Sequence, residues 1–394
     1  MDNFPLQQLW TDIARELAEL ETAGLRRDIL PIEAIDGPLV RIRGRSLVCW
    51  CSNDYLGLSA HPRLRAVAAE VVSTWGVGSR ASRLLSGTSL WHQRLEEALA
   101  AWFAAQAAVV YPSGYLANLG TITALLSNRD VVLVDRLAHA SLIEAARASR
   151  ARFRVFHHND ASHAAELLSR SSSARRRMIV TEGVFSMEGD CAPLRDLLEV
   201  AEAHQALVYV DDAHGAFVLG DTGRGSPEAA GLPHHRFLYM GTLGKALGCQ
   251  GGFVTGPVPL IRFLHHRARS FIYTTALPTS VVAAAVEALE ILGREMHHRL
   301  CLWERVRSLT HHLHVRRLLP ESIGSHIIPV EVGRSDKAIR LSARLWQAGI
   351  WAPAIRPPTV PKGKARLRLS VTALHTQQQI EDLVCALQDA VRQT

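Results

Sequence analysis

The sequence lacks the features that mark membrane, secreted and disordered proteins. Its longest apolar stretches, such as 98–108, contain polar breaks and fall far short of the roughly 20 residues that span a bilayer. No basic segment followed by an apolar run opens the chain, so we expect no secretory signal and a cytoplasmic location. The six cysteines form no C-x-x-C pair, which argues against a disulfide framework. With 48% hydrophobic and 21% charged residues, the composition is that of a folded globular protein.

Several familiar motifs are also missing or incomplete. Gly76–Ala81 fits G-x-G-x-x-A, but it follows a helical stretch rather than a strand, which disfavours a nicotinamide site. Gly244-Lys245 resembles the end of a P-loop, but the upstream glycine is absent and alanine follows the lysine. The histidine pairs lack H-E-x-x-H spacing, and adjacent helical residues point about 100° apart, so we expect no metal site.

Acidic residues are fewer than basic ones, 37 against 44, which gives a net charge of +7. Much of the excess is arginine, in patches at 175–177, 262–269 and 294–317. The simplest interpretation is a solvated basic surface, and the alternative is a landing zone for an acidic partner. Zinc-finger spacing, a basic region leading into heptads and aromatic-rich RNA motifs are all absent, so nucleic acid is not expected as a partner.

Strand and helix signals alternate over the middle of the chain. Short apolar runs typical of buried strands occur at 108–111, 131–134, 153–156, 178–181, 207–210 and 237–240. Helical lengths of sequence, such as 194–204, separate these runs. The pattern predicts an α/β fold with a large, mostly parallel sheet flanked by helices. Ligands on such sheets bind where loops leave the carboxyl ends of the strands.

The two ends of the chain have a different pattern. An amphipathic helix with Leu6, Leu9 and Leu17 on one face precedes Gly24, and short strands follow it. Beyond the large sheet, the sequence predicts one long helix over 281–319, strands at 327–332 and 365–371, and helices at 336–348 and 376–391. We therefore predict three units: an N-terminal helix and strands (1–55) packing with a smaller α+β domain (286–394), and a large sheet domain (56–285).

The candidate chemistry lies at two neighbouring strand ends. Asp211 ends a buried strand, and His214 follows on the next loop. Lys245 stands in a glycine-rich turn after the following strand. Singly, each has an ordinary explanation, because a strand-end aspartate can cap a helix and a loop lysine is commonly exposed. Together they match pyridoxal phosphate, which needs a lysine for a Schiff base and a carboxylate beside its pyridinium nitrogen.

Two further segments fit the same cofactor. Ser113-Gly114-Tyr115 follows the strand at 108–111 and would open a helix whose N-terminus holds the phosphate. His139 follows another strand and would stack on the ring. The large domain is therefore the predicted cofactor-binding domain.

Longer stretches carry a family resemblance over nearly the whole chain. They read Ser52-Asn53-Asp54-Tyr55-Leu56-Gly57-Leu58, Thr181-Glu182-Gly183-Val184-Phe185-Ser186-Met187, Asp211-Asp212-Ala213-His214-Gly215 and Arg224-Gly225-Ser226. With these motifs the sequence resembles the α-oxoamine synthases, a branch of the fold-type I pyridoxal-phosphate enzymes. The segments 354–361 and 365–369 resemble the member of biotin biosynthesis more than the threonine-pathway ligase or aminolevulinate synthase. Cys49-Trp50-Cys51 departs from the family's plainer residues.

The resemblance implies a role for each candidate residue. Lys245 would bind the cofactor and move the α-proton of the amino acid, and His139 would stack on the ring. Asp211 would pair with the pyridine nitrogen and His214 with the ring hydroxyl. The other implied residues are Gly114, Tyr115 and Thr242 for the phosphate, Thr274 or Thr275 for a neighbouring subunit's cofactor, Asn53, Glu182 and Ser186 for the site lining, and Arg27, Arg356, Thr359 and Arg368 for the substrates. Arg368 would bind the amino-acid carboxylate, and Arg26 competes with Arg27 for the acyl substrate.

The resemblance also implies an activity. A homodimeric acyltransferase would join glycine or L-alanine to an acyl thioester of coenzyme A or acyl carrier protein, releasing CO2 and the free thiol. In the biotin branch, the amino acid would be L-alanine and the acyl group pimeloyl. The basic patches would attract either acidic carrier.

Three alternatives remain. One is another synthase of the family with a different acyl donor. A catalytically inactive regulatory partner is disfavoured because Lys245, Asp211 and His214 are all present. A DNA-binding regulator on this fold is disfavoured because only about 50 residues precede the cofactor-binding region, too few for an added helix-turn-helix domain.

Overall fold

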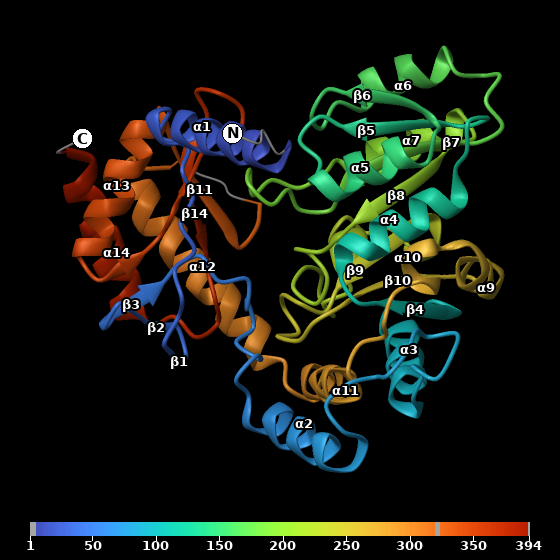
Figure 1. Ribbon diagram of the computed structural model, residues 1–394, viewed down its shortest axis with the longest axis horizontal. Helices are drawn as coiled ribbons and strands as arrows, with labels where there is room; N and C mark the ends of the chain where they lie inside the picture. The colour runs from blue at the N-terminus through green and yellow to red at the C-terminus, as the bar shows by residue number, and fades with distance from the viewer. Residues whose placement is uncertain (1–4, 320–323, 393–394) are drawn as a thin grey trace.

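A seven-stranded sheet forms the core of the larger part of the molecule, on the right in Figure 1. The computed structural model describes residues 5–319 and 324–392. The sheet has the order β4-β10-β9-β8-β7-β5-β6. Its strands are β4 (Ala107–Tyr111), β5 (Val131–Asp135), β6 (Arg152–Phe156), β7 (Arg177–Glu182), β8 (Leu207–Asp211), β9 (Leu238–Thr242) and β10 (Gly252–Gly256). Neighbours from β9 to β6 are parallel, and β10 is antiparallel to both β4 and β9. The predicted α/β fold with a mostly parallel sheet is confirmed.

Both faces of this sheet are buried, which explains its continuous apolar strands. In β5, Val132 and Val134 pack on one face with α4 (Gly114–Leu125), α5 (Ala140–Ala148) and α9 (Val258–Arg267). Val131 and Leu133 pack on the other face with α6 (Ala161–Ser169) and α7 (Leu194–Ala203). This alternation follows the two-residue period of a strand. The carboxyl ends of β5, β7, β8 and β9 consequently meet at one edge of the sheet, close to the start of α4.

The remaining strands form two smaller sheets. The first has the order β11-β14-β13, with β11 (Ile327–Gly333), β13 (Ala354–Ile355) and β14 (Ala365–Ser370) antiparallel. The second joins β1 (Ala34–Asp36), β2 (Leu39–Ile42) and β3 (Arg45–Cys49) to β12 (Ile350–Trp351), which runs parallel to β3. Helices α12 (His297–Val315), α13 (Ser335–Gln347) and α14 (Gln377–Arg392) pack beside these sheets (Figure 1). The boundaries at residues 55 and 285 stay predictions.

The long helix expected over 281–319 is wrong in its extent. The structure has α11 (Thr279–Arg294) and α12, separated at Glu295 and Met296. The two helices pack against different partners, α11 against α2 (Pro62–Trp75) and α3 (Leu90–Trp102), and α12 against α14. Because each apolar face must meet its own neighbour, the chain changes direction between them.

The N-terminal helix α1 (Pro5–Thr22) forms as expected and precedes Gly24, which has a φ of +67°. None of its residues is buried, so its amphipathic pattern does not reflect burial within this chain. In the described ranges 5–319 and 324–392, none of the helices combines the length and apolarity that a membrane span requires.

Candidate active site

A cavity of about 170 Å³ opens at the carboxyl edge of the large sheet. It is lined by Gly114, Tyr115, Asn118, His139, Ser141, Glu182, Asp211, Ala213, His214, Met240, Thr242 and Lys245. Apart from Ser113, which caps α4, the residues that the patterns alone predicted for the phosphate or the ring therefore line one space. The fold brings them together, because they come from the carboxyl ends of β4, β5, β8 and β9, which meet at one edge of the sheet.

One end of the cavity fits a phosphate group. Helix α4 begins at Gly114, and among the described residues the backbone N–H groups of Gly114 and Tyr115 have no hydrogen-bond partner. Ser113 caps the helix by accepting a bond from the Leu116 N–H. A Cβ at Gly252 would lie only 2.6 Å from the backbone nitrogen of Gly114, so glycine there permits the approach of β10. Free N–H groups and the helix dipole at this point favour an anion.

The buried side-chain amide of Asn118 holds the Asp211 carboxylate at the cavity. One carboxylate oxygen accepts a hydrogen bond from Asn118 Nδ2 at 2.7 Å, and the other accepts one from the Ala213 N–H at 3.0 Å. The Asn118 carbonyl oxygen accepts a bond from the Tyr209 hydroxyl at 2.9 Å. These contacts orient the carboxylate as a pyridinium partner requires. The sequence interpretation missed Asn118, although it stands one helical turn after Gly114 on α4.

Lys245 and His214 form a directed chain of hydrogen bonds. Nζ of Lys245 lies 2.7 Å from Nε2 of His214, whose Nδ1 lies 2.6 Å from the Tyr55 hydroxyl. Because Tyr55 donates its only proton to Asn53 Oδ1, His214 donates from Nδ1 and accepts at Nε2. Burial and Lys245 hold the pKa of His214 well below its usual range. Burial lowers the pKa of Lys245 to about 8, which favours a neutral amine for base chemistry.

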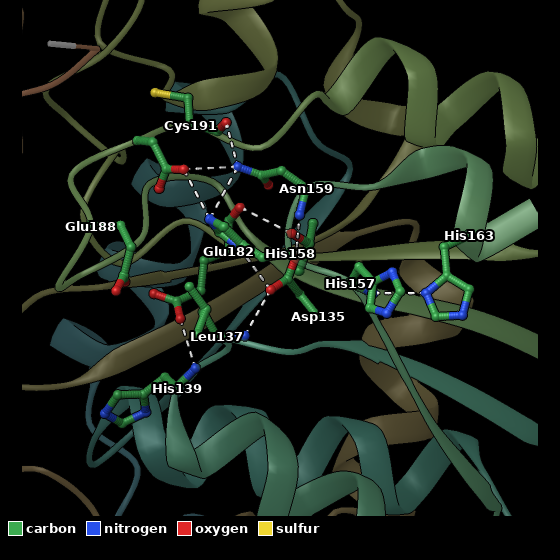
Figure 2. Close-up of polar contacts among 12 residues, drawn as sticks. Asp135, Leu137, His139, His157, His158, Asn159, His163, Glu182, Glu188 and Cys191 are labelled. Carbon is green, nitrogen blue, oxygen red and sulfur yellow. Dashed lines mark hydrogen bonds and ion pairs between the residues drawn. The ribbon is translucent and has the colours of Figure 1, made fainter. Parts of the chain in front are cut away.

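His139 lies at the start of α5 with its ring orientation fixed. Its Nδ1 accepts from the Ser141 N–H at 3.3 Å and lies 2.8 Å from the Ser141 hydroxyl. Its backbone N–H donates to Glu182 Oε1 at 2.6 Å (Figure 2). Burial, followed by the charge of Asp211, holds the pKa of Glu182 well above its usual range. His139, whose ring is expected to stack on the cofactor, is thus held by hydrogen bonds of both its backbone and its side chain.

A second anchor lies behind the His139 loop (Figure 2). His158 Nδ1 is 2.9 Å from Asp135 Oδ1, and its Nε2 is 2.9 Å from Asp190 Oδ2. Although partial burial opposes it, bonding to these two carboxylates raises the pKa of His158 to about 10. Asp135 also accepts from the Leu137 N–H at 2.8 Å, within the loop that leads to His139. The protonated ring therefore joins three loops at the sheet edge.

The residues expected to bind substrates fall into two groups. Arg368 on β14 donates to the Ser186 carbonyl, to Asn53 Oδ1 at 3.2 Å and to the Tyr55 hydroxyl at 3.3 Å. Since Tyr55 contacts His214, this group adjoins the cavity. Arg27 instead contacts Thr359 at 3.3 Å on an exposed surface.

Arg356 belongs with Arg27, because it is half-buried and donates to the carbonyls of Gly24 and Arg26, in the segment next to Arg27. The Arg26 side chain turns away to Glu21 and Asp28, at 2.8 and 3.1 Å. Thr359 and Thr275 do not line the cavity described above. The substrate roles of this group, and the role of Thr274 or Thr275 toward a neighbouring subunit, stay predictions.

Comparison with known proteins agrees with this geometry. The family model of aminotransferase class I and II matches residues 45–387. The 8-amino-7-oxononanoate synthase of Anaeromyxobacter dehalogenans is 44% identical over 375 residues, covering 95% of this chain and 94% of the relative. The enzyme of the same name from Janthinobacterium is 42% identical, covering 98% and 100% of the two chains.

Solved structures give the same picture. A serine palmitoyltransferase from S. paucimobilis, which holds a pyridoxal phosphate–myriocin compound, superposes with a TM-score of 0.93 at 31% identity over 98% of both chains. An 8-amino-7-oxononanoate synthase from Francisella tularensis superposes with a TM-score of 0.74 at 27% identity, covering 88% of this chain and 98% of the other.

Fold, cavity and comparisons together define a pyridoxal-phosphate-dependent enzyme of the class I and II aminotransferase family. Within that family the chain belongs to the α-oxoamine synthases, which are acyltransferases. The cavity fits the cofactor, because it offers unpaired N–H groups at a helix start, an oriented carboxylate and a lysine in one space.

Proposed function

We propose that this enzyme catalyses the 8-amino-7-oxononanoate synthase reaction. L-Alanine and a pimeloyl thioester would give 8-amino-7-oxononanoate, CO2 and the free thiol, a step of biotin biosynthesis in the cytoplasm. The main support is identity of 41–46%, over 93% or more of each chain, to proteins of that name, combined with a cavity that holds the groups the cofactor requires. The alternative is another α-oxoamine synthase that acts on a different acyl thioester.

The chain's own residues divide the chemistry among them. Bound pyridoxal phosphate supplies an aldehyde for the amino group and an electron-accepting pyridinium ring. Asp211 would keep the proton on the ring nitrogen, and the N–H groups of Gly114 and Tyr115 would hold the phosphate. Lys245, with its lowered pKa, would take the α-proton of the amino acid and return a proton after CO2 is lost. Arg368 would bind the substrate carboxylate beside His214.

The positive charge of one surface of the protein supports an acidic carrier for the acyl group. A basic cavity of about 590 Å³ is lined in part by Arg175, Arg176, His266, Arg267 and Arg269. Coenzyme A and acyl carrier protein are both acidic, so this surface would steer either one with a marked salt dependence. Turnover with a carrier-protein donor should fall with added salt and in Arg267→Glu; insensitivity to both would contradict the steering role.

We also propose a homodimer, in which Thr274 or Thr275 reaches the neighbouring subunit's cofactor.

A substrate panel tests the proposed reaction. The cofactor-loaded protein is incubated with L-alanine, glycine or L-serine and with pimeloyl, acetyl, succinyl or palmitoyl thioesters, and free thiol release is followed. Preference for L-alanine with a pimeloyl donor supports the proposal. Faster release with acetyl, succinyl or palmitoyl donors would overturn the substrate assignment and select the alternative.

A further inference from the structure

Three side chains of the types that bind metals converge outside the lining of the cofactor cavity, where α11 ends and α12 begins. His61 caps the start of α2, Glu295 follows the last residue of α11, and His298 lies in the first turn of α12. Their ligand atoms all lie within 4.8 Å of one another. The two helices α2 and α11 lie side by side at this end of the molecule (Figure 1). The fold thus joins residues that are more than 200 positions apart in sequence.

His298 is oriented as a ligand. Its Nδ1 lies 3.2 Å from the Leu56 carbonyl oxygen, which only accepts, so Nδ1 carries the proton. The other nitrogen, Nε2, then presents a lone pair; it is buried and has no hydrogen-bond partner among the described residues. Metal-binding histidines characteristically donate their second ring N–H to a carbonyl or carboxylate in this way.

The lone pair of His298 faces a negative charge. Glu295 Oε2 lies 3.5 Å from Nε2 of His298. Two acceptors at this distance repel each other unless a cation lies between them. In a tetrahedral zinc site with bonds of roughly 2.0–2.1 Å, neighbouring ligand atoms are about 3.3 Å apart, close to the separation found here.

His61 supplies the third donor. Its ring centroid lies 6.1 Å from that of His298, with 69° between the ring planes. Its Nδ1 accepts only a long bond of 3.3 Å from the Arg63 N–H, which a metal could displace. We propose that His61, Glu295 and His298 bind one Zn²⁺ ion, with water completing the coordination. Two imidazoles and a carboxylate are a typical zinc donor set, whereas Mg²⁺ and Ca²⁺ prefer oxygen.

This site is independent of the proposed reaction. It would tie the start of α2 to the α11–α12 junction and, through the Leu56 carbonyl, to the segment that carries Asn53 and Tyr55. The sequence predicted no metal, since adjacent histidines are poor chelators. The site avoids that difficulty because it uses only His298 of the 297–298 pair.

Zinc and cobalt titrations of the full-length, cofactor-loaded protein test the site. We expect one Zn²⁺ per chain by equilibrium dialysis and a rise in Tm on binding. Co²⁺ should give visible d–d absorption beyond the cofactor bands, without the near-ultraviolet charge-transfer band of a thiolate ligand. Glu295→Gln and His298→Gln should each weaken Zn²⁺ binding at least about tenfold. His311→Gln, an exposed histidine on the same helix, should leave it unchanged.

Two results would contradict the proposed zinc site. The absence of saturable binding in the wild-type protein would overturn the proposal. Unchanged affinity and Co²⁺ spectrum in both Glu295→Gln and His298→Gln would do the same, by placing the metal elsewhere. Far-ultraviolet circular dichroism of the metal-free variants establishes that each is folded, so a loss of binding reports on the ligands.

Discussion

Lys245 Nζ lies 2.7 Å from Nε2 of His214, and the histidine accepts this hydrogen bond. The direction follows from Tyr55, whose single hydroxyl proton goes to Asn53 and leaves its oxygen to accept from His214 Nδ1. A chain of neutral groups therefore ends on the lysine amine. With its pKa lowered to about 8, that amine needs little free energy to lose its proton near neutral pH.

The first prediction concerns this lysine. Lys245→Ala should lower kcat by about 10³-fold or more, because it removes both the covalent link and the base. The measurement is thiol release with saturating substrates, beside circular dichroism of the variant. Lys364→Ala is a matched control, since Lys364 is exposed and its ammonium group pairs with Glu331. Near-normal turnover of the Lys245 variant would refute the assignment.

Much of this site could be predicted because it depends on strand ends. Buried apolar runs mark the strands, and a parallel sheet brings their carboxyl ends to one edge. Asp211, His139 and Lys245 each follow such a run, so their meeting follows from the fold class. The phosphate end follows from Gly114 at the start of a helix. The family resemblance added roles that spacing alone does not give.

Other groups could not be predicted from local patterns. Tyr55 reaches His214 from a loop 159 positions away, and Arg368 reaches Tyr55 across 313 positions. The break between α11 and α12 is equally hidden, since both halves have helical periodicity and only their different packing partners separate them. In the sequence, His158 is part of one of several adjacent histidine pairs, and nothing nearby indicates its role. Only the fold brings Asp135 and Asp190 to the two nitrogens of its ring.

The second prediction tests the buried amide behind Asp211. Asn118→Leu keeps the branched shape of the side chain but removes the 2.7 Å hydrogen bond to that carboxylate, together with the Asn118 bonds to Ser141 and Tyr209. Loss of the bond to a charged group alone corresponds to roughly 10- to 100-fold, so we expect kcat to fall by at least about tenfold. Cofactor affinity, followed by absorbance on dialysis, should fall as well. Thr123→Val on the same helix should change neither, and equal effects in both variants would point to a general weakening of α4 instead.

The third prediction is a pH dependence of stability. The pKa of His158 is raised from 6.5 to about 10 in the folded protein. Its stabilising contribution is therefore complete below about pH 6.5 and is lost as the pH rises toward 10. The difference in Tm between the wild-type protein and His158→Gln should be largest at pH 6 and shrink steadily at alkaline pH. A difference that stays constant from pH 6 to 10 would show that the ring acts without its charge.

The fourth prediction is that Arg368 contributes to binding of the amino acid but not of the acyl thioester. Its guanidinium has five N–H donors, and four of them bind the Ser186 carbonyl, Asn53, Tyr55 and Ser370. The second N–H on the terminal nitrogen beside Tyr55 has no partner among the residues that the structure describes, and we propose that it binds the amino-acid carboxylate. Arg368→Lys cannot reproduce this fixed fork, so the KM for L-alanine should rise at least about tenfold while the KM for the acyl thioester changes little. Arg366→Lys, two residues earlier on β14 and bonded to Glu188 instead, is the matched control. An equal rise in both KM values would mean that Arg368 supports the loops around the cavity without binding the carboxylate itself.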